Sequence, residues 1–179
     1  WTQATVDMFA QSNENIIYAA LGDDPNAFLQ LSTPSNVLGG TLEGCYAGPS
    51  LPTPPFTSEP EWSSHEDIEL RMAQRGKMFV CYNSAAGRAD QSLAVRTYVI
   101  ASFLLTYTPS STLLWESFAT PNKFHILPES QLVALDPVIA SPSSVSQLRS
   151  PGGAYVREYR ACSFAGSLIG ECAVVINPD

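Results

Sequence analysis

Apolar segments of strand length alternate with helix-like stretches along this chain, and this alternation restricts its fold more than any other feature. The strand-like segments span residues 15–21, 37–46, 77–83 and 112–117, and helical patterns span 2–12, 63–75 and 89–107. Strands separated by helices pair in parallel, because the chain must cross back over the sheet between them. The sequence therefore predicts an α/β fold with a mainly parallel sheet.

Two of the predicted helices carry further signals. Ser63 and Ser64, followed by Glu66 and Asp67, are typical of the first turn of a helix, and Gly76 is typical of the residue after its end. The segment 89–107 is almost wholly apolar, which indicates a helix buried nearly all round.

The alternation stops after residue 117. A proline-rich loop is predicted at 48–61, and proline and serine dominate 121–153. Residues 154–178 then alternate well enough for two strands around Gly166 and Gly170, which predicts a terminal β-hairpin. We interpret 1–179 as one domain.

Charge and hydropathy exclude two classes of partner. Nine Lys and Arg residues stand against 17 Asp and Glu residues, for a net charge of −8, and the basic residues form no cluster that would neutralise phosphates. We therefore expect no nucleic acid partner. No apolar run approaches the roughly 18 residues that a membrane span needs. The chain begins at Trp1, and we expect that any targeting peptide has been removed or lies outside it.

The cysteines indicate a redox environment rather than a metal. They show no CxxC spacing and no zinc-like arrangement with histidine, so no metal site is expected. An even cysteine number in an acidic chain favours an oxidising, extracellular compartment, with Cys45–Cys81 and Cys162–Cys172 as the favoured pairs of the three possible pairings. Four buried, reduced thiols are the alternative. Phosphate-binding glycine motifs are absent, and no cofactor is expected.

Several segments together resemble a known family. They are the strand ending in Glu43-Gly44, the long loop, the apolar helix, and a terminus that carries Tyr155, Arg157, Phe164, Gly166, Asn177 and Pro178. In this order they resemble the C-terminal half of glycoside-hydrolase-like (β/α)₈ barrels, which are related to endo-α-1,4-polygalactosaminidases. The resemblance implies a partial, half (β/α)₈ barrel of the TIM type. The chain is too short for a whole barrel of about 250 residues.

The resemblance has two departures. The acidic residue that the family would carry on its fourth strand lies in the missing first half of the barrel. The segment between Cys162 and Cys172 is longer than the family's short turn. A half barrel would expose sheet edges, so another chain or segment would have to complete it.

Glycosidic cleavage needs two carboxyl groups on either side of the bond. Glu43 is the first candidate, because it lies at the predicted carboxyl end of a strand, where barrel enzymes build their active sites. Glu116, at the end of another predicted strand, is the second. A structural role for Glu43, paired with an arginine or a backbone amide, is the alternative.

Aromatic side chains near these acids are candidates for sugar stacking, because the apolar face of a pyranose fits an aromatic ring. They are Tyr46, Trp62, Tyr82 and Trp115, and core packing is the alternative for each. Asp23 and Asp24 follow the first strand in the position of a βα loop, and ordinary turn chemistry is favoured over a functional role for them. Arg157 and Arg160 are expected to pair with carboxylates, and His65 and His125 to lie at the surface or at caps.

These observations lead to two functional hypotheses. The first is a glycoside hydrolase that uses paired carboxylates, one of them outside this chain, with a glycan or polysaccharide as its substrate. The second is a non-catalytic, glycan-binding or structural component of an extracellular assembly, which the proline-, serine- and threonine-rich loops also suit.

Overall fold

A computed structural model describes residues 2–19, 26, 29–30, 33–48, 56–83, 92–108, 112–116 and 131–178. Its helices are α1 (Thr2–Gln11), α3 (Glu59–Gln74) and α4 (Ser92–Thr106), with the short 3₁₀ helix η2 (Val145–Leu148). Its strands are β1 (Ile16–Tyr18), β2 (Val37–Glu43), β3 (Met78–Asn83), β4 (Thr112–Glu116), β5 (Leu132–Ala134), β6 (Tyr155–Phe164) and β7 (Ser167–Ile176). Each of the three predicted helices and six predicted strands coincides with an observed one, and β5 and η2 are additions.

Two sheets of different kinds organise the chain. Strands β1 to β4 pair in parallel and in chain order. Strands β5, β6 and β7 form a second, antiparallel sheet, in which β6 and β7 make a long hairpin at the predicted position. A bulge interrupts the hairpin between Tyr159 and Cys162.

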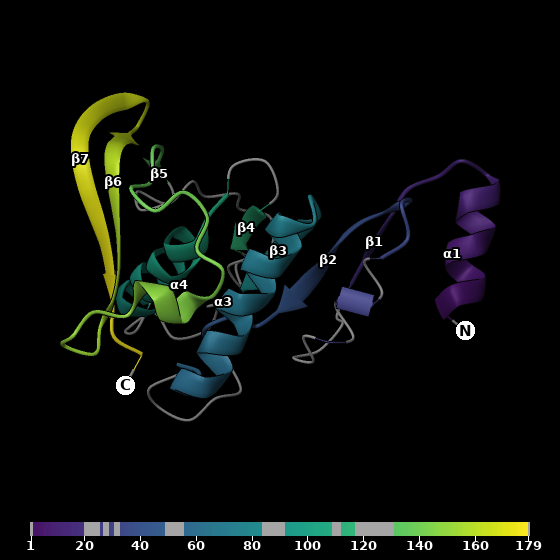
Figure 1. Cartoon of the computed structure of the whole chain (residues 1–179), viewed down its shortest axis with the longest axis horizontal. Coiled ribbons are helices and arrows are strands. Elements are labelled where there is room, and N and C mark those ends of the chain that lie inside the picture. The colour runs from purple at the N-terminus through teal and green to yellow at the C-terminus, as the bar shows by residue number, and fades with distance from the viewer. Residues whose placement is uncertain are drawn as a thin grey trace.

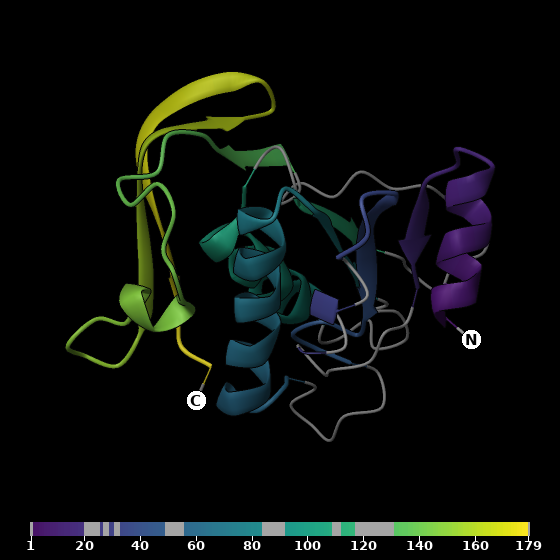
Figure 2. The same cartoon turned by 45° about the vertical axis from the view of Figure 1, so that its right-hand side comes forward.

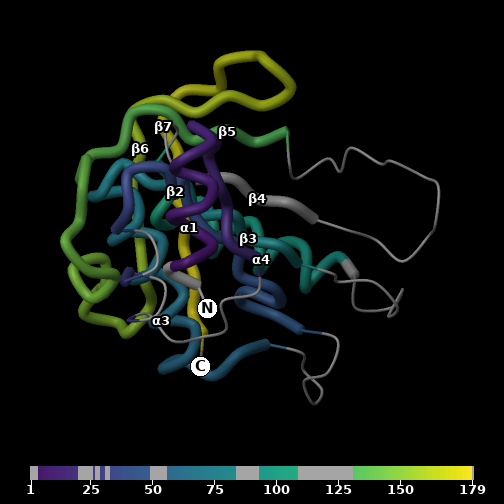
Figure 3. Tube along the Cα trace, turned by 90° about the vertical axis from the view of Figure 1, so that its right-hand side faces the viewer, coloured from purple at the N-terminus to yellow at the C-terminus, as the bar shows by residue number. Residues whose placement is uncertain are grey.

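The helices α3 and α4 lie between the two sheets (Figures 1 and 2). The β6–β7 hairpin is at one end of the molecule, and α1 lies beside β1 at the other end, in the foreground when the molecule is viewed from that side (Figure 3). The Asn36 side-chain amide donates to the main-chain oxygen of Val6 at 3.2 Å, which joins α1 to the start of β2.

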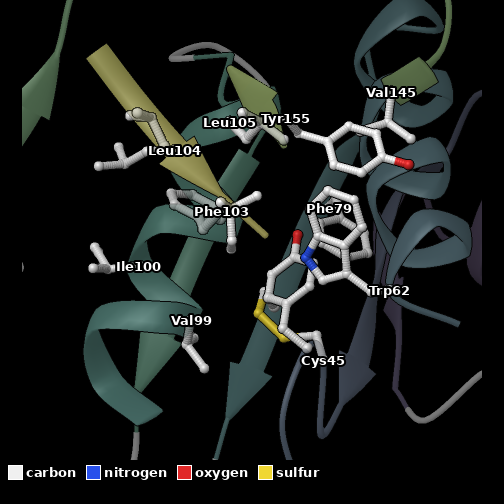
Figure 4. Close-up of a cluster of buried hydrophobic side chains, with 14 of the residues drawn as sticks. Cys45, Trp62, Phe79, Val99, Ile100, Phe103, Leu104, Leu105, Val145 and Tyr155 are labelled. Atoms are coloured by element: carbon white, nitrogen blue, oxygen red, sulfur yellow. A yellow bond between two sulfur atoms is a disulfide. The ribbon is translucent and has the colours of Figure 1, made fainter. Parts of the chain in front are cut away.

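The core lies in this middle layer. Helix α4 contributes buried residues from Val95 onward, among them Val99, Phe103 and Leu105, and Phe79 of β3 belongs to the same cluster from the parallel sheet (Figure 4). From the antiparallel sheet, Val174 and Ile176 complete the same cluster. An apolar helix is stable here because a sheet covers it on each side.

The expected half (β/α)₈ barrel is wrong. In such a barrel the helices form an outer ring whose outer face meets solvent. Here the β6–β7 hairpin packs against α4, and the Arg157 guanidinium and the Tyr159 hydroxyl both donate to main-chain oxygens of α4. The strands described after β4 pair antiparallel, whereas a barrel would continue with further parallel strands. The fold is a small α/β protein with a helix layer between a parallel and an antiparallel sheet.

Candidate functional site

The carboxyl ends of β2, β3 and β4 meet at one edge of the parallel sheet, which we call the carboxyl edge. The register pairs Glu43 with Tyr82 and Tyr82 with Trp115, so that these three residues form one row across three strands. The Glu43 side chain is exposed and that of Tyr82 is half-buried. The fold therefore brings together three of the residues that the sequence proposed for a site.

Glu116 lies one position beyond this row. Its register partner on β3 is Asn83, not Tyr82. Since neighbouring strands are about 4.8 Å apart, the backbones of β2 and β4 are roughly 10 Å apart at this edge. The two candidate acids are thus on strands separated by one intervening strand.

The chain leaves β2 through a turn of unusual geometry, residues 44–47, which we call the Tyr46 turn. Gly44 has a φ of +73° and Tyr46 a φ of +66°. Glycine adopts this left-handed region freely, but a bulky residue there is strained and persists only where its surroundings hold it. The contacts of the turn show what holds it.

Strand β3 holds the turn from one side. A disulfide joins Cys45 to Cys81, with the Cα atoms 5.9 Å apart. The Asn83 side-chain amide is buried and donates to the main-chain oxygens of Cys45, at 2.7 Å, and of Ala47, at 2.6 Å. The Gly44 amide donates to the Tyr82 oxygen at 2.8 Å.

Helix α3 and Thr57 hold Tyr46 from the other side. The Tyr46 amide donates to Nδ1 of His65 at 3.2 Å, and its hydroxyl donates to Oε2 of Glu69 at 2.9 Å. The Tyr46 main-chain oxygen accepts from both the amide and the hydroxyl of Thr57, each at 3.0 Å. Every polar group of Tyr46 is therefore bonded in the interior.

The acids behind this turn are fully buried. Glu66 and Glu69 have no exposed surface, and the Thr106 hydroxyl donates to Oε2 of Glu66 at 2.7 Å. Burial, and then the nearby Glu69, raises the pKa of Glu66 well above its usual range. Burial, and then the two glutamates, likewise raises the pKa of the Tyr46 hydroxyl, which keeps it protonated and able to donate.

Sequence reasoning missed this buried polar group. It placed the start of α3 at Ser63 and Ser64, with Glu66 as a residue of the first turn, but α3 begins at Glu59. Trp62, His65, Glu66 and Glu69 therefore share one face in the interior of the helix, which we call the α3 stripe. The missed signal was the i, i+3, i+4, i+7 spacing of these residues from Trp62, which is typical of the buried face of a helix.

Two predicted stacking residues are out of reach of a ligand. Tyr46 and Trp62 are both fully buried. The Trp62 indole donates to the Ser102 hydroxyl at 2.8 Å, and its ring centroid lies 4.7 Å from that of Tyr155 (Figure 4). An aromatic ring that stacks on a sugar must have one face exposed to solvent, and both faces of these rings are buried in the core.

The other polar candidates have mostly structural places. Arg160 pairs with Asp136 at 3.3 Å, as expected. Arg157 instead donates to main-chain oxygens, among them that of Leu105 at 2.8 Å. His65 is buried, so its expected surface position is wrong. Asp23, Asp24, His125 and residues 49–55 of the predicted 48–61 loop lie outside the described residues. The loop prediction is wrong for residues 59–61, which belong to α3.

The structure also contains an open groove away from the carboxyl edge, with a volume of about 500 Å³. It lies over β6 and β7, and its lining includes Val138, Glu158, Arg160 and Glu171. The charges of this lining have both signs, and Arg160 already pairs with Asp136. We assign no chemistry to this groove.

Both predicted disulfides are confirmed, Cys45–Cys81 and Cys162–Cys172. Such bonds persist in oxidising compartments, so the pairing is compatible with an extracellular protein. None of the helices in the described ranges has the length and apolar character to cross a bilayer. The same part of the chain holds no group of three or more His, Cys, Asp or Glu side chains arranged for a metal ion.

Comparison with known proteins adds no relative to this description. No protein family, curated protein or solved structure matches the chain. A functional assignment therefore rests on the site geometry.

Proposed function

We propose that the carboxyl edge binds a glycan and that Glu43 takes part in hydrolysing its glycosidic bond. The observation that carries the proposal is the row of Glu43, Tyr82 and Trp115 across three parallel strands. Carboxylates accept hydrogen bonds from sugar hydroxyls, and aromatic residues suit the apolar face of the ring. Ligands of parallel sheets commonly bind beyond the carboxyl ends of the strands.

In this proposal the reaction uses two carboxyl groups. One protonates the leaving oxygen, and the other acts as nucleophile or activates a water molecule. Glu43 is the exposed acid, and Glu116 is the other acid that the sequence singled out. Glu116 lies one position beyond the row of Glu43, on a strand roughly 10 Å away. Because successive residues of a strand alternate between the two faces of a sheet, this position belongs to the face opposite Glu43. In this proposal the second acid therefore comes from outside the described residues.

A second candidate function is glycan binding without cleavage. One observation favours it: Glu116 lies a position beyond the row that holds Glu43, so the row itself contains a single acid. One carboxylate beside aromatic residues is sufficient to bind a sugar, but hydrolysis requires the pair.

The Glu43→Gln variant tests both proposals. The glutamine keeps the size of the side chain and removes its acid chemistry. The matched control is Glu14→Gln, because Glu14 is exposed and precedes β1 at the opposite edge of the same sheet. The measurements are binding to a panel of neutral, acidic and amino-sugar polysaccharides, and the release of reducing ends from each.

For a hydrolase we expect wild type and Glu14→Gln to cleave one polysaccharide, and Glu43→Gln to cleave it at least about a hundredfold more slowly. Binding without cleavage, weakened by Glu43→Gln alone, would support the second function. Equal binding and cleavage by Glu43→Gln and wild type, or no binding to any polysaccharide, would refute both.

A further inference from the structure

The Tyr46 turn is more firmly held than a surface turn needs to be. Its bulky residue has a left-handed φ of +66°, a conformation that tyrosine does not favour by itself. Strained backbone of this kind concentrates at functional sites, where the surrounding structure imposes it. The turn begins immediately after Glu43, the exposed acid of the carboxyl edge.

We propose that Glu69 is a positioning residue for Glu43, acting through its hydrogen bond with the Tyr46 hydroxyl. Glu69 is fully buried on α3, and its Oε2 lies 2.9 Å from that hydroxyl. A buried carboxylate in this position fixes the tyrosine ring, and the ring fixes the left-handed backbone to which it is attached.

The main-chain contacts carry this constraint back to Glu43. Nδ1 of His65 accepts a hydrogen bond from the Tyr46 amide, and the Thr57 hydroxyl donates one to the Tyr46 main-chain oxygen. The Gly44 amide, next to Glu43, bonds to the oxygen of Tyr82. Since Tyr82 is the register partner of Glu43, this bond ties the turn directly to the row that contains Glu43.

The protonation of Tyr46 supports the same direction of bonding. Burial raises the pKa of the Tyr46 hydroxyl, so it stays protonated and donates, and Oε2 of Glu69 accepts. Loss of either partner leaves a buried polar group unsatisfied, and the strained turn then gains by opening.

The consequence for the site rests on the proposed function. A catalytic acid must be held close to its productive geometry, and small displacements are costly in rate. By this inference α3 supplies that precision from the interior, although it contributes no side chain to the edge itself.

The test is native-state amide hydrogen exchange on three variants of the full chain. Glu69→Met keeps the length of the side chain and removes the acceptor, Tyr46→Phe removes the donor, and Glu69→Gln keeps an acceptor oxygen. The matched control is Glu66→Met. Glu66 lies three residues before Glu69 on α3 and is equally buried, but it bonds to Thr106 rather than to the Tyr46 turn.

We expect the amides of Gly44, Tyr46 and Thr57 to exchange about tenfold faster in Glu69→Met and in Tyr46→Phe than in wild type. The amides of Leu135 and Val138, which bond to β6, report general loosening and should change little. Glu69→Gln should restore slow exchange, and Glu66→Met should leave the three turn amides protected.

Unchanged exchange at the three turn amides in Glu69→Met would overturn the inference, and so would equal acceleration at every amide or in Glu66→Met. The exchange measurement needs no ligand. If no polysaccharide binds, the proposed function fails while the exchange data still decide whether Glu69 fixes the turn. If a polysaccharide does bind, Glu69→Met should weaken its binding or cleavage and Glu69→Gln should rescue it.

Discussion

Glu66 is a carboxyl group without access to water. Its Oε2 accepts from Thr106, and burial together with the neighbouring Glu69 raises its pKa well above the usual range. The folded protein therefore holds a proton on Glu66 at pH values where the unfolded chain, with an ordinary glutamate pKa near 4.3, has released it. Because the folded state binds more protons, stability must fall as the pH rises above that value.

Glu66→Gln should remove this dependence, because glutamine stays neutral at every pH. In wild type the contribution of Glu66 to the free energy of unfolding is fully present below about pH 4.3. As the pH rises, this contribution is lost at up to about 1.4 kcal/mol per pH unit until the pH reaches the pKa of Glu66 in the folded state. Urea unfolding of both proteins between pH 4 and pH 8 measures it. The stability of Glu66→Gln relative to wild type should increase as the pH rises. If the free energies of unfolding of the two proteins change in parallel with pH, the raised pKa of Glu66 is contradicted.

The structural position of a residue could be predicted where a simple sequence pattern indicated it. The favoured one of the three possible cysteine pairings was correct, and the apolar strand pattern placed Glu43 at the end of its strand. The α3 stripe did not, because glutamate and histidine count as polar in any hydrophobic pattern. Only the tertiary contacts with Tyr46 and Thr106 show why these side chains are buried.

At the scale of elements, β2 depends on a glycine where it meets β3. A Cβ atom built on Gly39 would lie 1.9 Å from the main-chain oxygen of Met78, its register partner. This neighbour is backbone and cannot rotate away. At Gly44, by contrast, a Cβ would meet no atom within 4 Å, although the φ of +73° is unfavourable for other residues.

Gly39→Ala should therefore push β2 away from β3 and cost about 3 kcal/mol or more in the free energy of unfolding. Gly44→Ala, the control, should cost about 1–2 kcal/mol for its backbone conformation alone. Chemical denaturation of the two variants gives both values. A Gly39→Ala protein as stable as Gly44→Ala would show that β2 and β3 are not so closely apposed.

Elements were more predictable than their packing. The apolar pattern of α4 correctly indicated burial on all sides for residues 99–106, but Leu93, Ala94 and Thr97 near its start are exposed. The same pattern fits any helix that is covered on both sides. In a barrel its outer side would be polar. The few polar positions of α4 fit the second covering layer that β6–β7 provides, although we expected a barrel.

At the scale of the whole molecule, each sheet is stapled by one disulfide. Cys45–Cys81 joins the Tyr46 turn to β3 of the parallel sheet, and Cys162–Cys172 joins the two strands of the hairpin. The helix layer then connects the two sheets through side chains such as Trp62, which packs on Tyr155 of β6. The stability of the molecule should therefore depend unequally on its two cross-links.

The two staples close loops of very different length, with sequence separations of 36 for Cys45–Cys81 and 10 for Cys162–Cys172. A cross-link stabilises mainly by restricting the unfolded chain, so its loss should cost about 4 kcal/mol for the longer loop and about 3 kcal/mol for the shorter. The double variants Cys45→Ala/Cys81→Ala and Cys162→Ala/Cys172→Ala, unfolded in urea, measure this. We expect the first to be the less stable and to lose amide protection at Tyr46, which the second should keep. The reverse order of stability would mean that the hairpin staple, and not the one beside Glu43, does more to hold the fold together.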